Sequence, residues 1–348
     1  MKLLKSLGVS VLTLSAVLAS ASSMADKLVI SNWDGYMPAD MMERFKKATG
    51  IDAELALHAT NEEIMGKVVA SKGKGYDVIF VSSPFVEALN KLDLIADIDH
   101  SQIPNTKNLY KQANNLKYDK GNKMSMPYAW GTTGLCYRAD LMDEPTSWND
   151  LLKPNDKLKG KVTMLSTDRW LMAAGFLSLG HSVNTAKQSE IEAAKDVLIE
   201  AKKSILAYDD ATFYAKLVSG EATMTHAWDG WCNYGTAENP NIKYTIPKEG
   251  TDMWVDTMVI PKNSKMKKEA HAFINFVLSQ DIGVWIANNV MYKTPNEAAM
   301  SSLDKELLKA YPNLAMTPDQ IMAQEQLRDL GKTQKAYTKA VTEILASN

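Results

Sequence analysis

This sequence lacks most of the features that mark an enzyme or a metal protein. Its 348 residues contain two cysteines and five histidines, and the histidines share no metal-ligand spacing. It has no phosphate loop, no dinucleotide fingerprint, no zinc-hydrolase motif and no serine nucleophile elbow. We therefore expect a chain with no metal and no cofactor. An exported enzyme built from dispersed residues ranks well behind a binding protein.

Long apolar runs are also absent after residue 25, where no stretch approaches the about 18 residues of a membrane helix. The first 25 residues have the order of a secretory signal: the basic start MKLLK, a short apolar run, and the small residues of SSMA. We expect cleavage after Ala25 and a soluble, exported chain. The remaining 323 of 348 residues suffice for two domains.

The chain without its leader carries little net charge. Without Lys2 and Lys5, 37 of the 39 basic residues remain against 41 acidic ones, a formal charge of −4. This balance disfavours nucleic acid as a partner and is compatible with a cationic ligand.

Cys136 and Cys232 lie far apart in the sequence, and two arrangements are open for them. An oxidising compartment permits a disulfide, whereas a chain with a full core can equally hold two buried thiols. The sequence favours neither arrangement.

Strand and helix patterns alternate along the chain. The first cycle predicts a strand at KLVISNW, a helix over residues 39–49, a strand at IDAELAL, and a helix at NEEIMGKVVASK with Asn61 as its N-cap. A second cycle begins near residue 135, and residues 267–289 predict one long helix. This order is typical of an α/β fold whose parallel or mixed sheet is covered on both faces. Because no linker rich in Gly, Pro or Ser divides the chain, we expect lobes joined by several chain crossings.

Aromatic and acidic residues gather at the turns where the predicted strands end. In open α/β sheets, ligands bind beyond the carboxyl ends of the strands. Aromatic faces attract ammonium groups, and carboxylates add charge-assisted hydrogen bonds, so such a set suits a linear polyamine. Taken singly, each Trp is more often a packed residue, and an Asp after it can cap a helix. The turns are Trp33-Asp34-Gly35-Tyr36, Trp228-Asp229-Gly230-Trp231, Trp254-Val255-Asp256 and Tyr292.

A series of motifs runs in order through most of the chain: NWDGYMP, YDVIFVSS, MPYAWGTTGL, SWNDLLKP, IPKEG, WVDTMVIP, AHAFINFVLSQDI and YKTPNEAA. The series resembles that of the periplasmic spermidine/putrescine-binding proteins of bacterial polyamine ABC importers. The resemblance implies a two-lobe periplasmic-binding-protein fold of type II, each lobe a mixed sheet flanked by helices, which closes on its ligand by hinge bending. Lobe 1 would comprise residues 26–134 and 256–298, and lobe 2 residues 135–255 and 299–348.

The resemblance also implies which residues bind the ligand, by their position in these motifs. Asp256 would pair with a ligand ammonium, and Ser82 would offer a hydroxyl. The aromatic walls and a polar contact from the C-terminal segment would come from Trp33, Tyr36, Trp228, Trp254, Tyr292 and Gln326.

Two positions depart from the family pattern. The acid that precedes the tyrosine of the first turn is Gly35 here, and Asp34 lies one residue earlier. The main acid of the second lobe aligns with Trp170. A ligand ammonium there would lose a charge-assisted hydrogen bond of about 1.5–3 kcal/mol and gain a cation–π contact. Asp229 is a candidate for the second carboxylate. A short diamine, an unusual polyamine, or an amine with an aromatic or uncharged end all remain open.

The resemblance finally implies a periplasmic receptor that captures a polyamine of the putrescine/spermidine class in the cleft between the lobes. It would deliver this ligand to an inner-membrane ABC permease. We expect a monomer that neither spans the membrane nor binds nucleic acid. A polyamine-sensing subunit that docks on a membrane signalling receptor is the second hypothesis, and the sequence does not separate sensing from transport.

Overall fold

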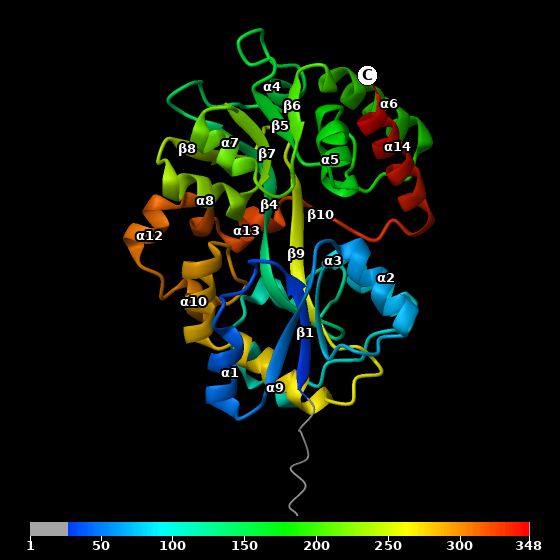
Figure 1. Cartoon of the computed structure of the whole chain (residues 1–348), viewed down its shortest axis with the longest axis vertical. Helices are drawn as coiled ribbons and strands as arrows, with labels where there is room; N and C mark the ends of the chain where they lie inside the picture. Colours follow the sequence, from blue (N-terminus) through cyan, green and yellow to red (C-terminus); the bar gives the residue numbers. More distant parts are fainter. Residues whose placement is uncertain (1–26, 348) are drawn as a thin grey trace, which may run out of the picture.

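The computed structural model describes residues 27–347, so the expected leader and its cleavage after Ala25 lie outside the described residues. Figure 1 shows two halves, one above the other, joined by long strands near the centre. We call the half built on β1, β2 and β3 lobe 1, and the half built on β5, β6 and β7 lobe 2. The two-lobe α/β architecture expected from the sequence is confirmed. Across residues 27–347 no helix has the length and apolarity needed to cross a membrane.

The strands of the described chain form one mixed sheet in the order β2-β1-β3-β9-β4-β7-β5-β6, with β10 beside β9 and β8 beside β4. β1 pairs in parallel with β2 and β3, whereas β9 runs antiparallel to both β3 and β4. The bounds are β1 Leu28–Trp33, β2 Ala53–His58, β3 Val78–Ser82, β4 Met126–Arg138, β5 Val162–Met164, β6 Ile205–Tyr208, β7 Met224–Trp228, β8 Ile242–Thr245, β9 Asp252–Val259 and β10 Glu325–Gln326.

Helices cover the sheet in both lobes, as the alternating pattern predicts (Figure 1). Their bounds are α1 Met41–Thr49, α2 Asn61–Ser71, α3 Ser83–Lys91, α4 Trp148–Leu152, α5 Asp168–Ser178, α6 Gln188–Lys202, α7 Phe213–Ser219, α8 Asp229–Glu238, α9 Lys267–Val277, α10 Gln280–Val290, α11 Glu297–Met300, α12 Lys305–Ala310, α13 Pro318–Met322 and α14 Gln334–Ala346. Short 3-10 helices lie at His100–Gln102, Pro104–Asn108, Lys111–Asn114, Pro312–Ala315 and Gly331–Thr333.

Two predicted helix details are wrong. The N-cap of α2 is Thr60, whose hydroxyl accepts the backbone N–H of Glu63, and not Asn61. Asn61 instead bonds Ser82 at the end of the neighbouring strand. The predicted single helix over residues 267–289 is two helices, because Ser279 has an extended backbone and starts α10 after α9 has ended.

The lobes are joined by strands that run from one into the other. The first part of β4, through Thr132, pairs with β9, and its second part, from Thr133, pairs with β7 of lobe 2. The second half of β9, from Asp256 to Val259, pairs with β3 of lobe 1. β4 and β9 run side by side between the two halves in Figure 1. Residues on these strands therefore lie where the lobes meet, which is where a closing cleft has its floor.

The C-terminal segment provides a third crossing. After β10 the chain runs along α3 of lobe 1 and then returns to α14, which packs on α5 and α6 of lobe 2. Arg328 makes a bidentate pair with Glu87 of α3, and the backbone N–H of Asp329 donates to the same carboxylate. On the other side, Arg169 of α5 donates to the carbonyl of Arg328. The segment is therefore bonded to both lobes.

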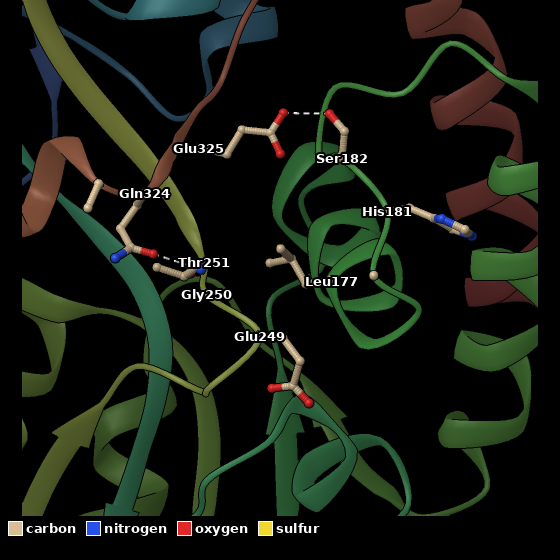
Figure 2. A pocket seen from close by; sticks show the side chains of 10 residues that line it. Leu177, His181, Ser182, Glu249, Gly250, Thr251, Gln324 and Glu325 are labelled. Carbon is tan, nitrogen blue, oxygen red and sulfur yellow. Dashed lines mark hydrogen bonds between the residues drawn. The ribbon is translucent and has the colours of Figure 1, made fainter.

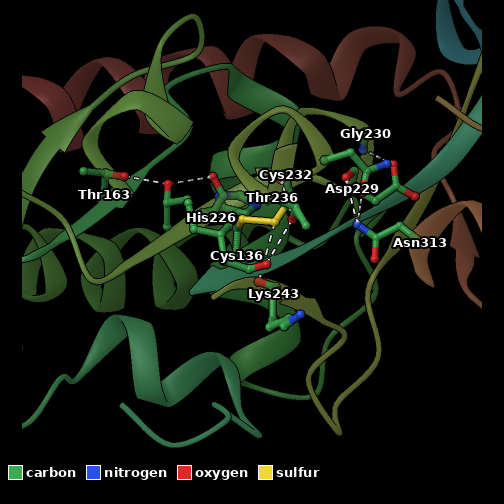
Figure 3. Close-up of a disulfide and its surroundings, with 12 residues drawn as sticks. Cys136, Thr163, His226, Asp229, Gly230, Cys232, Thr236, Lys243 and Asn313 are labelled. Atoms are coloured by element: carbon green, nitrogen blue, oxygen red, sulfur yellow. Dashed lines mark hydrogen bonds between the residues drawn. A yellow bond between two sulfur atoms is a disulfide. The ribbon is translucent and has the colours of Figure 1, made fainter. Parts of the chain in front are cut away.

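Cys136 and Cys232 form a disulfide, which resolves the two arrangements that the sequence left open. Figure 3 shows the bridge between β4 and α8, the helix that begins at Asp229. The bridge closes a loop of 96 residues and lies in the interior of lobe 2. It therefore fastens α8 to β4, a strand that crosses between the lobes.

Candidate functional site

The carboxylate of Asp256 is the centre of the candidate site. Its Oδ2 accepts the hydroxyl of Tyr36 at 2.8 Å, and its Oδ1 accepts the hydroxyl of Ser82 at 2.6 Å. β3 and β9 place Ser82 directly opposite Asp256 in the sheet. Part of the Asp256 residue is exposed to solvent. A carboxylate that is held by two hydroxyls is well placed to accept an ammonium group.

The surroundings of Asp256 raise its pKa to about 6. Burial is the main cause, because it disfavours the charged form, and the hydroxyls of Ser82 and Tyr36 oppose it. Asp256 is thus ionised at neutral pH but holds its proton more strongly than a surface aspartate. Burial and the neighbouring Asp256 charge in turn raise the pKa of Tyr36, so its hydroxyl stays protonated as a donor.

Asn61 supports Ser82 from α2. Its amide nitrogen donates to the Ser82 hydroxyl at 3.0 Å, and its amide oxygen accepts the Ser82 backbone N–H at 2.9 Å. Because the Ser82 oxygen already accepts one hydrogen bond, its own proton is directed to Asp256. Sequence reasoning assigned Asn61 a capping role and missed this one.

Tyr36, whose hydroxyl bonds this carboxylate, lies at the centre of a cluster of aromatic rings. The Tyr36 ring lies 5.5 Å from Trp33, 5.5 Å from Tyr128 and 5.2 Å from Tyr292 between ring centroids. Trp254 extends the chain of rings, 5.5 Å from Tyr292. The contacts are all edge-to-face, a favourable arrangement for aromatic pairs. The first turn, β9 and the Tyr292 segment thus meet in one aromatic cluster.

Tyr128 is a member of this cluster that sequence reasoning did not select. Its hydroxyl donates to the backbone carbonyl of Tyr36 at 2.8 Å, which fixes the first turn against β4. The only sequence signal was its place within the motif MPYAWGTTGL. Its side chain is almost completely buried, as are those of Tyr292 and Trp254, and through this bond it holds Tyr36 in place.

Trp170 and Trp228 form a second aromatic pair, in lobe 2. Their ring centroids are 5.4 Å apart at nearly right angles, and Phe213 lies behind Trp228 at 6.2 Å. Trp170 is the third residue of α5, and Trp228 is the N-cap of α8. Trp228 is partly exposed and Trp170 is 8% exposed. This pair presents ring surface, and no carboxylate, at the lobe 2 side.

Asp229 is buried, and its carboxylate accepts hydrogen bonds from the protein backbone. Its carboxylate accepts the backbone N–H groups of Thr132 at 3.1 Å and of Gly230 at 2.8 Å. Burial raises its pKa to about 7, which these donors and the nearby Lys293 oppose. Gly131 lies against the carboxylate so closely that a Cβ there would come within 2.6 Å of it. Asp229 therefore ties α8 to β4 where this strand passes from one lobe to the other.

Two predicted contacts are not joined to Asp256 by any hydrogen bond of the described residues. Asp34 has an exposed side chain at the outer edge of the first turn. Gln326 is buried and pairs with Met253, while its Oε1 accepts the backbone N–H of Lys117 at 3.0 Å. The structure therefore gathers the predicted aromatic residues into two clusters, one of them joined to Asp256 and Ser82 through Tyr36, and leaves Asp34, Asp229 and Gln326 outside both.

A cavity of about 350 Å³ lies elsewhere, between α5, the start of β9 and the segment before β10. Figure 2 shows Ser182 bonded to Glu325 and Gln324 bonded to the backbone of Thr251 across it. Its second acid, Glu249, accepts from the start of α4. Both carboxylates are used to hold loops together, so this cavity does not offer a free acid to a cation.

The described residues contain no cluster of three or more His, Cys, Asp or Glu side chains with the geometry to hold a metal ion. The site is instead a carboxylate bonded to two hydroxyls, beside a cluster of aromatic rings at the junction of two lobes. That combination of fold and site defines a two-lobed ligand receptor.

Comparison with known proteins places the chain within one family. A profile of bacterial extracellular solute-binding proteins matches residues 40–315. The spermidine/putrescine-binding periplasmic protein of Salmonella typhimurium is 30% identical over 332 residues, 94% of each chain. The putrescine/cadaverine-binding protein of Pseudomonas aeruginosa is 30% identical over 349 residues, 96% of this chain and 97% of that protein. The chain belongs to the bacterial extracellular solute-binding proteins.

A solved structure supports the same assignment. A putative spermidine/putrescine ABC transporter from Listeria monocytogenes superposes with a TM-score of 0.85 at 30% sequence identity. The match covers 92% of this chain and 99% of that one. The expected periplasmic-binding-protein fold is thereby confirmed.

Proposed function

We propose that this chain is an exported receptor that captures a polyamine of the putrescine/spermidine class between its lobes and delivers it to an inner-membrane ABC permease. The single observation that carries the proposal is the Asp256 carboxylate, which is bonded by Ser82 and by Tyr36, a member of an aromatic cluster. An ammonium group gains a charge-assisted hydrogen bond from such a carboxylate and cation–π attraction from the rings. The names of relatives at about 30% identity support the same ligand class.

Within this proposal, the lobes keep the division expected from the sequence, residues 26–134 with 256–298 and residues 135–255 with 299–348. Trp33, Tyr36 and Tyr292 contact the ligand beside Asp256, and Trp228 contacts it from lobe 2. Asp34 takes a place at the rim. The protein binds without chemical change to the ligand, acts as a monomer, and is released into the periplasm after cleavage at Ala25.

Titration calorimetry with putrescine, cadaverine, spermidine and norspermidine tests the ligand class. We expect saturable binding of at least one of them, and Asp256→Asn should raise its Kd by more than about tenfold, the loss of one charge-assisted hydrogen bond. Asp34→Asn is the matched control, because it removes an exposed carboxylate of the first turn that makes no hydrogen bond to Asp256 and should change Kd less than about threefold. Absence of heat with all four amines would overturn the proposal.

Three further measurements test the transport role, the absence of chemical change to the ligand, and the state of the exported chain. Uptake of labelled putrescine by cells with and without this chain distinguishes transport from sensing, since a sensor would leave uptake unchanged. Recovery of unmodified ligand after long incubation is expected of a receptor and not of an enzyme. Light scattering and N-terminal sequencing of the exported protein should give the mass of one chain that begins at Asp26.

A further inference from the structure

The ring of Tyr292 lies between residues of the two lobes. Its centroid is 5.2 Å from that of Tyr36 in the first turn and 5.5 Å from that of Trp254 on β9. A further neighbour is Gly230, the second residue of α8 in lobe 2. A Cβ at residue 230 would come within 2.4–2.5 Å of three atoms of the Tyr292 ring. The backbone of α8 therefore touches a ring that also packs on Tyr36, the residue bonded to Asp256.

Met291 sets the direction of the chain just before Tyr292. It follows the last residue of α10 and has a φ of 61°, in the left-handed region. This backbone conformation is unfavourable for a residue with a side chain, and it persists where neighbouring groups hold it in place. Because Met291 turns the chain out of α10, its conformation decides where the Tyr292 ring lies.

Two side chains of α8 hold this turn. Nδ2 of Asn233 donates to the backbone carbonyl of Met291 at 2.9 Å. The hydroxyl of Tyr234 donates to the backbone carbonyl of Val290, also at 2.9 Å. Carbonyls at the end of a helix have no partner within that helix, so both bonds complete the end of α10. Asn233 is buried, and its loss would leave the Met291 carbonyl without this donor.

Asn313 orients the amide of Asn233. Its Nδ2 donates to Oδ1 of Asn233 at 3.0 Å and to the backbone carbonyl of Asp229 at 3.0 Å. Figure 3 shows Asn313 beside Asp229, at the start of α8. Because Oδ1 of Asn233 accepts this bond, the amide nitrogen is directed to the Met291 carbonyl. One buried chain of hydrogen bonds thus runs from the start of α8 to the end of α10.

We propose that Asn233 is a positioning residue for the amine site. It holds the left-handed turn at Met291 and thereby sets the Tyr292 ring between the backbone of α8 and the first turn of lobe 1. Asn233 does not touch the ligand and acts on affinity through Tyr292, whose ring attracts an ammonium group. This inference rests on the proposed function, in which Tyr292 contacts the amine. A helix of lobe 2 therefore positions a ring that packs on lobe 1.

Fluorine NMR of the ligand-free protein labelled with 3-fluorotyrosine tests the position of the ring. The Tyr292 resonance is assigned by its loss in Tyr292→Phe. We expect Asn233→Ala to shift or broaden this resonance and to leave that of Tyr337, which packs on Phe176 under α14, at its wild-type position. An unchanged Tyr292 resonance would overturn the inference. This measurement needs no ligand, so its result does not depend on the proposed function.

Titration calorimetry with putrescine and spermidine measures the consequence for binding. Asn233→Ala should raise Kd by about three- to tenfold, within the range of one cation–π contact. Asn105→Ala is the matched control, because Nδ2 of Asn105 also donates to a carbonyl in the last turn of a helix, that of Asn275 in α9 at 2.9 Å. The control should lower Tm and change Kd less than about twofold.

The outcomes of this titration separate two failures. Equal rises in Kd for Asn233→Ala and the control would show that lost stability, and not the position of the ring, weakens binding, and the inference would be wrong. If the wild type bound neither putrescine, cadaverine, spermidine nor norspermidine, the proposed function would fail. The fluorine spectra would then still decide whether Asn233 positions Tyr292.

Two double variants test whether Asn233 acts through the turn and the ring. In the Tyr292→Ala background, Asn233→Ala should raise Kd no further, because the ring that it positions is absent. In the Met291→Gly background, the left-handed conformation needs no support, so Asn233→Ala should raise Kd less than about twofold. Effects that are fully additive in both backgrounds would contradict a positioning role.

Asn313→Ala provides a second variant in case Asn233→Ala folds poorly. It keeps the Asn233 side chain but removes the donor that orients it, so it should move the Tyr292 resonance in the same direction by a smaller amount. Gly230→Ala is the positive control, because its Cβ would displace the ring directly. A Tyr292 resonance that responds to Gly230→Ala and not to Asn313→Ala or Asn233→Ala would overturn the inference.

Discussion

The hydroxyl of Tyr36 donates a 2.8 Å hydrogen bond to Oδ2 of Asp256, which lies 220 residues later in the chain. This bond connects the first strand-to-helix turn of lobe 1 with the strand that crosses into lobe 2. Through this bond, Tyr36 lowers the pKa of Asp256 and so stabilises the ionised form of the carboxylate. The same bond gives the first two predictions a common physical origin.

Tyr36→Phe should weaken amine binding without abolishing it. The ring that packs on Tyr128 and Tyr292 is kept, while one donor to Asp256 is lost. We expect Kd for putrescine to rise by about three- to tenfold, as for one neutral hydroxyl donor. Titration calorimetry measures this Kd. Tyr110→Phe is the control, because it removes a hydroxyl outside the cluster. An unchanged Kd would mean that this bond does not serve the ligand.

Amine binding should weaken as the pH falls through about 6. The pKa of Asp256 is about 6 in the ligand-free protein, mainly because of burial, and only the ionised carboxylate attracts an ammonium. Affinity should be flat above pH 7 and fall by about tenfold per pH unit well below 6. In Tyr36→Phe the midpoint should move to higher pH, because a donor that lowers the Asp256 pKa is missing. A midpoint that stays in place in the variant contradicts the assignment to Asp256.

Gly131→Ala should damage both stability and binding. A Cβ at this position would lie 2.6 Å from Oδ2 of Asp229 and 2.6 Å from the Trp254 ring, on a crossing strand that cannot easily move. Overpacking of this kind costs about 1–3 kcal/mol of unfolding free energy. Gly66→Ala is the matched control, since a Cβ there meets nothing within 4 Å, and in α2 it should be neutral or stabilising. Thermal unfolding measures the stability of the two variants. Equal stability would show that the close approach at residue 131 is easily relieved.

Removal of the disulfide should lower the stability of the protein. The bridge between Cys136 and Cys232 closes a loop of 96 residues, and such bridges contribute about 2–4 kcal/mol. The Cys136→Ala/Cys232→Ala double variant should therefore unfold at lower denaturant concentration than the oxidised wild type. Reductant should shift the wild type toward the variant and leave the variant unchanged. If reductant moved both alike, its effect would not arise from this bond.

Local patterns in the sequence predicted the elements around the site better than their ends. Gly50, with a positive φ of 75°, ends α1 where the helix was expected to end. Asn61 was a reasonable N-cap by residue type, but Thr60 has the extended backbone of a cap and Asn61 bonds Ser82, a partner 21 residues away. The break at Ser279 was missed because the flanking helices are both apolar enough to form one continuous pattern.

The candidate site could likewise be predicted from the sequence only in part. Aromatic residues at strand ends could be found from the sequence, because the topology of an α/β sheet brings such ends together. Burial could not be found this way: Asp229 and Asp256 look alike in sequence, yet one is bonded to backbone N–H groups in the interior and the other is partly open.

The central claim is that the Asp256 carboxylate anchors a cationic amine between the lobes. Calorimetric titration of the wild type, Asp256→Asn and Asp34→Asn with putrescine and spermidine tests it most directly. The account predicts saturable binding to the wild type and to Asp34→Asn, and a Kd more than about tenfold higher for Asp256→Asn. Equal affinity of all three proteins would contradict it.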